Sequence, residues 1–272
     1  MKGFAFGQYY PADSLLHRLD PRAKLIMALM YVVTSFICQN ILGFAALLLS
    51  AILLVILSKI PMTTVLRSIR PVLFIILFTA IINIFMTGGD TLLVEWKFIR
   101  ISLEGLLNAA FMMVRIFVLI IGMGMFMTYT TTPIMLTDAI EQLLAPLKKI
   151  KVPVHEFAMM MTIALRFIPT LVEETEKIMS AQKARGADFS SGSLLSRAKA
   201  LIPILVPLVV SAFRRADELA TAMECRCYHG GDGRTRMTQL RYSGRDYAML
   251  AVMILFCAAC IAFNFLKIGY SM

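Results

Sequence analysis

Five long apolar runs are spread along the chain, and each is a candidate for a membrane-crossing helix. They cover about residues 25–37, 41–57, 71–86, 105–129 and 247–266, and a crossing helix needs roughly 20 largely apolar residues. Only residues 38–40 separate the first two runs, which predicts an antiparallel hairpin. A basic turn punctuated by Pro61 follows the second run, and a mixed polar loop that holds Trp96 precedes the fourth. The pattern predicts an all-α polytopic membrane protein with about five transmembrane helices.

The segment between the fourth and fifth runs has helical periodicity, and its helices end in charged residues. Helices are expected from Pro133 to Pro146, from Pro153 to Arg185 and from Leu194 to Arg226, with kinks at Pro169, Pro203 and Pro207. Their apolar stretches are too short to cross a membrane: residues 200–213 lie between charges, and Arg166 interrupts the other stretch. We therefore expect a cytoplasmic coupling domain of about three helices, inserted before the last span. The predicted division is a membrane domain (1–130), coupling helices with a basic loop (131–246) and a last transmembrane helix (247–272).

Composition supports residence in a membrane and excludes several other classes of protein. Of the 272 residues, 59% are hydrophobic and 16% are charged, with a mean hydropathy of +0.77. Soluble chains have about 45–50% apolar and 25% charged residues, so disordered, collagen-like and nucleic-acid-coating proteins are excluded. Basic residues gather in 1–24 and 59–70 rather than in 87–104. The positive-inside rule then places the N-terminus in the cytoplasm, and five crossings place the C-terminus outside.

The two long helices of the coupling domain end in similar sequences, offset by 41 residues. Ala184-Arg185-Gly186 closes the first helix, and Cys225-Arg226-Cys227 closes the second. For either copy alone, capping of the helix end is a sufficient explanation, because cations and glycine both favour helix C-termini. Two copies flanked by small residues favour a paired docking device, since an arginine fork suits a carboxylate in a partner groove.

Three motifs together resemble one known family over nearly the whole chain. The N-terminal segment runs from Gly7-Gln8-Tyr9-Tyr10-Pro11 to Leu19-Asp20-Pro21-Arg22-x-Lys24, residues 164–169 read Ala-Leu-Arg-Phe-Ile-Pro, and Ala184-Arg185-Gly186 follows. This combination resembles the transmembrane T component of energy-coupling factor (ECF) transporters. The second arginine motif departs from the Ala-Arg-Gly type, because Arg226 is kept between two cysteines.

That resemblance implies a non-catalytic scaffold in the inner or plasma membrane of a prokaryotic cell. Two ABC-type ATPases would each accept one motif arginine, and a membrane S component would bind the vitamin or micronutrient that is taken up. ATP and Mg would be bound by the ATPases, and this chain would bind no cofactor. The sequence agrees in one respect: no G-x-x-x-x-G-K-[ST] phosphate loop occurs in it.

Arg115 is the other candidate site, because it lies within the fourth apolar run, where a charge is costly. We expect a structural role, with the guanidinium held inside the bundle by Asn83, Asn108 or backbone carbonyls. The competing hypothesis is an intramembrane enzyme that uses Arg115 and polar groups of residues 155–166 on a lipid substrate.

No metal, redox or nucleic-acid site is expected elsewhere. Cys225, Cys227 and His229 lack the usual two-pair ligand spacing, and Cys257 and Cys260 are typical of small apolar residues in a span. The acidic residues at 173, 174 and 176 are expected on a solvated helix face. The basic loop before the last run follows from positive-inside bias without nucleic acid.

Methionine is abundant, with 20 residues and clusters at 112–113, 123–127 and 159–161. Either these side chains fill ordinary core and lipid-facing positions, or part of the surface repacks against several S components that share this scaffold. A scaffold dedicated to a cobalt or nickel importer is the alternative within the same family.

Overall fold

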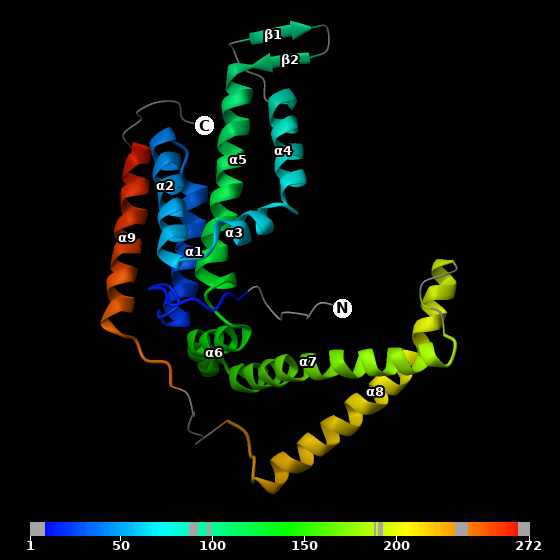
Figure 1. Ribbon diagram of the computed structural model, residues 1–272. Helices are drawn as coiled ribbons and strands as arrows, with labels where there is room; N and C mark the ends of the chain where they lie inside the picture. Colours follow the sequence, from blue (N-terminus) through cyan, green and yellow to red (C-terminus); the bar gives the residue numbers. More distant parts are fainter. Residues whose placement is uncertain are drawn as a thin grey trace. The chain divides into compact units, whose positions relative to one another are not determined.

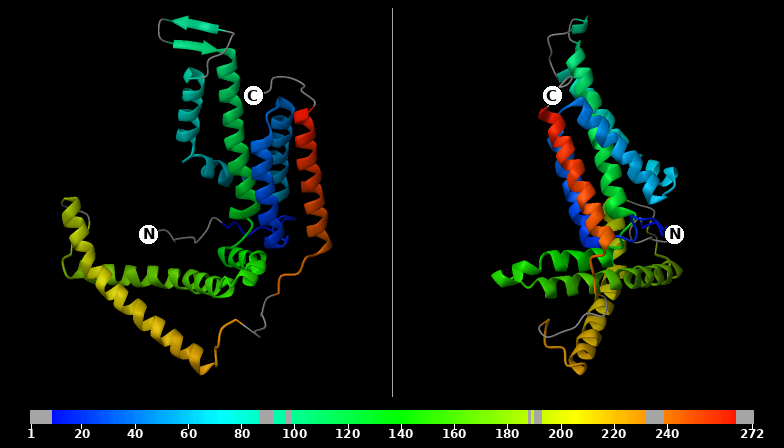
Figure 2. Two further views of the ribbon diagram at one scale, coloured as in Figure 1. Left: turned by 180° about the vertical axis from the view of Figure 1, so that it is seen from behind. Right: turned by 90° about the vertical axis from the view of Figure 1, so that its left-hand side faces the viewer.

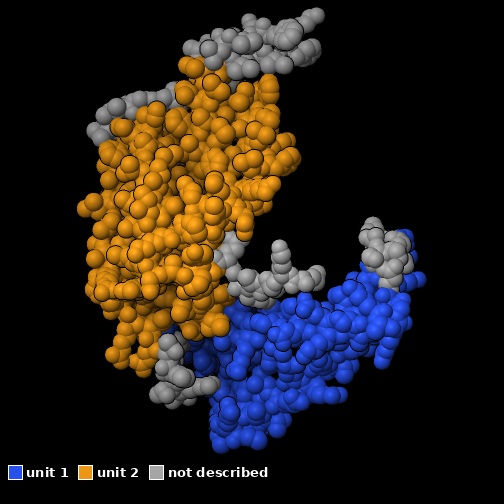
Figure 3. Space-filling model, viewed as in Figure 1, with its two compact units in different colours: residues 1–6, 140–238 blue, residues 7–139, 239–272 orange. Residues whose placement is uncertain are grey.

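The computed structural model describes residues 9–86, 92–96, 99–187, 189, 193–231 and 239–265. It divides into two compact units: residues 7–139 with 239–272, here the membrane unit, and residues 1–6 with 140–238, here the coupling unit (Figure 3). Each unit is described by itself.

Four long helices make the body of the membrane unit: α1 (Pro21–Ile37), α2 (Ile41–Ser58), α5 (Leu103–Met123) and α9 (Gly244–Phe265). Helix α1 packs against α9 and α5, and α2 packs against both as well (Figures 1 and 2). Buried side chains between them include Met27, Tyr31, Leu47, Val118 and Cys260. The predicted hairpin of α1 and α2 and the predicted final helix are confirmed.

Capping residues mark where α1 and α5 begin. Asp20 caps α1 by accepting from the backbone N–H of Arg22 (2.9 Å), and Pro21 occupies the first helical position. Ser102 caps α5 by accepting from the N–H of Gly105 (3.0 Å). Helix α5 continues into a π-helix, η1 (Gly124–Thr128), so the predicted fourth run is one long helical segment. At Gly122 a Cβ atom would overlap the ring of Tyr31, so glycine permits the close approach of α1 and α5.

The predicted basic turn after α2 is wrong, because part of it is a helix. Residues Met62–Ile69 form α3, which is bent by 57° from the following helix α4 (Leu73–Met86). Val65 and Ile69 recur at i and i+4 and are both buried, which is the pattern of a short amphipathic helix. Pro71 then separates α3 from α4, since proline cannot continue the hydrogen-bond ladder.

The loop around Trp96 is also more regular than predicted. Strand β1 (Leu92–Trp96) pairs antiparallel with β2 (Ile99–Ser102), with Leu92 opposite Ser102 and Trp96 opposite Ile99. The two strands contain Val94, Trp96, Ile99 and Ile101, residue types that favour strands. The fold is therefore helical, with one β-hairpin among the described residues.

Helices α2, α5 with η1, and α9 are each long and apolar enough to cross a membrane, and the bent pair α3–α4 is a fourth candidate in the described part of the chain. Helix α1 has 17 residues and is not among these candidates. The structure thus supports three to four crossings by length and composition, where the sequence predicts about five.

The coupling unit is built on two long helices, α7 (Val154–Ala184) and α8 (Leu194–Cys225), which pack together. The chain reaches them through α6 (Pro133–Leu143) and a short 3-10 helix, η2 (Ala145–Ile150) (Figure 1). The predicted bounds of α6, α7 and α8 are confirmed to within a few residues. Both long helices continue through their internal prolines, and neither is a candidate span.

Candidate coupling site

The first motif arginine, Arg185, lies where α7 ends in a left-handed residue. Gly186 has a φ of +89°, and its N–H donates to the carbonyl of Lys183 (3.0 Å). The N–H of Ala187 donates to the carbonyl of Gln182 (3.0 Å). These two bonds form a Schellman motif, which satisfies carbonyls at the helix end. A Cβ on Gly186 would meet no described atom within 4 Å, so the backbone conformation, not crowding, favours glycine here.

The second motif arginine, Arg226, ends α8 in the same way. The N–H of Cys227 donates to the carbonyl of Glu224 (2.9 Å), and the N–H of Tyr228 donates to that of Met223 (3.1 Å). Cys227 has a φ of +54°, in the left-handed region that glycine adopts more readily. The replacement of glycine by cysteine in this copy therefore leaves the geometry of the helix end unchanged.

Both motifs are accessible. The six residues concerned are all exposed: Ala184, Arg185, Gly186, Cys225, Arg226 and Cys227. Among the residues that the structure describes, none forms a hydrogen bond or ion pair with either guanidinium. A guanidinium offers five N–H donors in a planar fork and stays charged at physiological pH. Each helix end can therefore present an unsatisfied cation to a partner.

Helices α7 and α8 are joined by a polar contact between Glu174 and Arg215. Arg215 Nη2 donates to Glu174 Oε2 at 3.1 Å, and the Ser211 hydroxyl donates to Glu174 Oε1. The guanidinium also lies 5.8 Å from the centre of the Phe167 ring. The predicted solvated acidic face is thus wrong for Glu174, which is half-buried against α8.

This contact lies at the same distance along the chain from each motif arginine. Glu174 lies 11 residues before Arg185, and Arg215 lies 11 residues before Arg226. At 1.5 Å per residue, each arm from the contact to its arginine is about 16 Å long. The two arginines therefore terminate arms of equal length that start from one contact.

Arg115 has a separate contact in the membrane unit. Its Nη2 donates to the carbonyl oxygen of Cys38 (3.0 Å), and its guanidinium carbon lies 5.2 Å from the centre of the Phe44 ring. Of the partners that the sequence suggested, the structure thus gives Arg115 a backbone carbonyl, in the joint between α1 and α2.

The cysteines are free thiols throughout. Cys225 and Cys227 are exposed, whereas Cys38, Cys257 and Cys260 are buried. Within the described ranges, no three side chains of the metal-ligating types come together.

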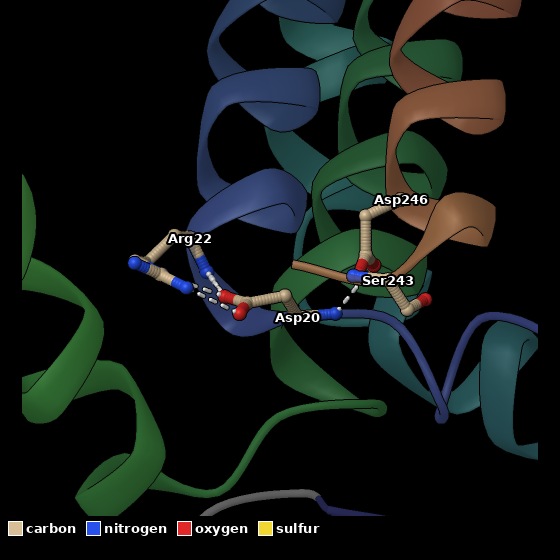
Figure 4. A network of polar contacts seen from close by, with 4 residues as sticks. All are labelled: Asp20, Arg22, Ser243 and Asp246. Carbon is tan, nitrogen blue, oxygen red and sulfur yellow. Dashed lines mark hydrogen bonds and ion pairs between the residues drawn. The ribbon is translucent and has the colours of Figure 1, made fainter. Parts of the chain in front are cut away.

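A polar cluster surrounds the first turn of α1 (Figure 4). The N-terminal motif contains three of its residues, Asp20, Arg22 and Lys24, but did not indicate their contact with Asp246. Asp246 accepts from the backbone N–H of Asp20 at Oδ1 (2.8 Å) and from that of Ser243 at Oδ2 (2.7 Å). Arg22 pairs with Asp20 (2.8 Å) and stacks over the Tyr242 ring, 4.1 Å from its centre. The first turns of α1 and α9 are thereby joined.

Lys24 completes this α1 polar cluster, defined as Asp20, Arg22, Lys24 and Asp246. Its side chain is 1% exposed, and Nζ donates to the carbonyl oxygen of Thr130 (2.9 Å). Burial disfavours the ionised form of Asp20, at the cap of α1, but hydrogen bonds from Arg22 outweigh it and hold the pKa of Asp20 below its usual value. Three charges within five residues, directly before an apolar run, are the signal that could have identified the cluster.

Comparison with known proteins gives one consistent result. The family described as "Cobalt transport protein" (CbiQ) matches residues 12–238. An energy-coupling factor transporter transmembrane protein EcfT of Clostridium kluyveri is 52% identical over 264 residues, which are 96% of this chain and 97% of the relative. The proteins of the same name from Ruminiclostridium cellulolyticum (94% of this chain, 95% of the relative) and Bacillus subtilis (95% and 97%) are 54% and 46% identical.

Proposed function

This chain belongs to the CbiQ family as a transmembrane component of energy-coupling factor transporters, and from this premise we propose that Arg185 and Arg226 each contact one of two ATPase subunits. A protein of this kind is a non-catalytic, multi-pass membrane subunit of a bacterial transporter. Membership of the family therefore excludes an intramembrane enzyme that would use Arg115 on a lipid.

The equal arms of α7 and α8 carry the proposal. Two ATPases related by a two-fold axis present two like grooves, and two arms of the same length from one contact are suited to reach both. An exposed guanidinium that enters such a groove would form a bidentate, charge-assisted pair with a carboxylate. Because the flanking residues are small, the groove can approach each arginine closely.

ATP and Mg are assigned to the ATPases in this proposal, since the sequence has no phosphate-binding loop. The chain's own contribution is mechanical: α7 and α8 receive the closing and opening of the ATPases, and the membrane helices pass that movement to the S component.

The surface proposed for the S component is apolar. Helix α8 exposes a row of large hydrophobic side chains: Leu201, Ile202, Leu205, Val206, Val209, Val210 and Phe213. A patch of this kind on a helix outside the hydrocarbon needs a partner or a membrane surface to cover it. Met160 and Met161 of α7 are also exposed, and flexible methionines would let one scaffold fit several S components.

The proposed topology keeps the N-terminus and residues 131–246 in the cytoplasm. Five crossings are obtained if α1 spans together with α2, the bent pair α3–α4, α5 with η1, and α9. At 1.5 Å per residue, the 17 residues of α1 reach about 26 Å, slightly short of a 30 Å hydrocarbon core. The domain division at 130/131 and 246/247 and the outside position of the C-terminus belong to this proposal.

The cargo distinguishes the two candidate transporters within the family. A scaffold dedicated to cobalt or nickel would carry one S component, whereas a shared vitamin scaffold would carry several. Co-purification of this chain from native membranes under different vitamin limitations, followed by mass spectrometry, decides between them. A single S component under every condition would argue against sharing.

The test of the arginine contacts is the double variant Arg185→Glu with Arg226→Glu. Removing one partner of a buried charge pair typically costs about 2–5 kcal/mol, so both ATPases should be lost on co-purification while the chain still inserts in the membrane. A matched control is Lys177→Glu with Arg214→Glu, which makes the same charge change at exposed positions of α7 and α8. Retention of both ATPases by the arginine variant would refute the assignment.

A further inference from the structure

The α1 polar cluster is unusual because it contains buried charges at the edge of an apolar bundle. Lys24 is 1% exposed, Asp246 2% and Asp20 7%. Taking charges out of water is unfavourable unless each is paired and hydrogen-bonded. The neighbours of these side chains therefore indicate what the cluster holds together.

On one side, the cluster holds the chain where it leaves the membrane unit. Lys24 Nζ donates to the carbonyl oxygen of Thr130 (2.9 Å) and lies 3.5 Å from the hydroxyl of Thr131. Both residues lie in the short connection between η1, which ends at Thr128, and α6, which begins at Pro133. The backbone N–H of Tyr10 adds a bond to the carbonyl of Tyr129 (3.0 Å).

On the other side, the cluster holds the chain where it returns. Asp246, in the first turn of α9, accepts from the backbone of both Ser243 and Asp20. Tyr242, one residue before Ser243, lies under the guanidinium of Arg22. Figure 4 shows the carboxylate of Asp246 pointing to the backbone of Asp20, with Arg22 on the other side of Asp20.

Two chain segments connect residues 140–238 with the membrane helices, and they define two attachment points: one segment begins at Thr131 and the other ends at Tyr242. Lys24 holds the first attachment point by its bond to Thr130, and Arg22 and Asp20 contact Tyr242 and Asp246 at the second. All three residues lie in or beside the first turn of α1. We propose that Asp20, Lys24 and Asp246 are positioning residues that fasten these two attachment points to α1, so that movement of the coupling helices is transmitted to the membrane helices. Charge-assisted hydrogen bonds suit this task, because they are shorter and stronger than neutral ones. This inference rests on the proposed function, in which ATPases move α7 and α8.

Hydrogen–deuterium exchange of the full complex, without nucleotide and with ATP and Mg, tests the inference without knowledge of the cargo. In the wild type, peptides covering 18–28, 124–135 and 240–250 should change their exchange together with the coupling-helix peptide 176–187. A change at 124–135 and 240–250 without one at 18–28 would overturn the inference before any variant is made.

Two nearly isosteric variants then remove the fastening. Asp246→Asn replaces one of the two acceptor oxygens, and Lys24→Met removes the donor to Thr130. In both, the ATP-dependent change at 176–187 should persist and the change at 18–28 should be lost. Lys24→Arg keeps a charged donor and should restore the response, which a merely packing role for the side chain would not explain.

Matched controls are Asp13→Asn and Lys59→Met, which make the same chemical changes at exposed positions of the membrane unit. Both should respond as the wild type does. A retained response at 18–28 in Asp246→Asn and Lys24→Met overturns this inference and leaves the proposed function standing. If 176–187 itself does not respond to ATP in the wild type, the proposed function falls and this inference falls with it.

Discussion

The left-handed residue at the end of α8 gives a prediction whose size can be worked out from the backbone. Cys227 has a φ of +54°, which costs an L-residue roughly 1–2 kcal/mol relative to glycine. Glycine loses more freedom on folding, by roughly 0.5–1 kcal/mol. Cys227→Gly should therefore stabilise the end of α8 by about 0.75 kcal/mol, which is about a three- to fourfold change in the local opening equilibrium.

The amides that report this change are those of residues 227 and 228, which donate to the carbonyls of Glu224 and Met223. Their hydrogen exchange in the full chain, in detergent or nanodiscs, should slow about three- to fourfold in Cys227→Gly. Gly186→Ala should have the opposite effect on the end of α7, because alanine is strained at a φ of +89°. A steric clash would not contribute, since no described atom lies within 4 Å of the new Cβ.

Gly244→Ala is the matched control. Gly244 also has open space around its Cβ position, but its φ is not positive, so alanine should not accelerate exchange at the start of α9. If Gly186→Ala accelerates exchange and Cys227→Gly leaves it unchanged, the argument that the two helix ends share one strained geometry is refuted.

Two other features give predictions that separate measurements can check. Glu174→Gln and Arg215→Gln should be non-additive in a double-mutant cycle on thermal unfolding, with a coupling energy of about 1 kcal/mol for this half-buried pair; additive effects would contradict a shared contact. The exposed thiols of Cys225 and Cys227 should react with an impermeant maleimide in inside-out vesicles but not in intact cells, and labelling from outside would contradict the cytoplasmic placement of α8.

Helix positions were predictable because their signals are local. Pro21 after Asp20, the short joint before α2 and the glycine after Arg185 each mark a boundary within a few residues. Helix α3 was not predicted, because Arg67 and Arg70 suggested a turn although Val65 and Ile69 have helical spacing. The spacing of the apolar residues, not the charge of the arginines, is the local signal for this helix.

Contacts between distant residues could not be predicted in this way. The partner of Glu174 lies 41 residues along the chain, and Asp246 lies 226 residues from Asp20. Nothing in the local sequence specifies such pairs, because they depend on how the helices pack. The motif around Asp20 was visible, but its role requires the position of α9.

The offset of 41 residues between the arginine motifs is the same as the offset between Glu174 and Arg215. Equivalent positions of α7 and α8 therefore contact each other, which makes the two arms alike in length as well as in sequence. A partner with two like grooves would need two helix ends of the same shape. That shape depends on the backbone conformation after the arginine more than on the side chain of the residue that follows it. This explains how Cys227 can replace glycine: the left-handed turn after Arg226 is kept, with the same two hydrogen bonds that follow Arg185. The identity of the flanking residue can thus vary, provided that the helix still ends at the arginine.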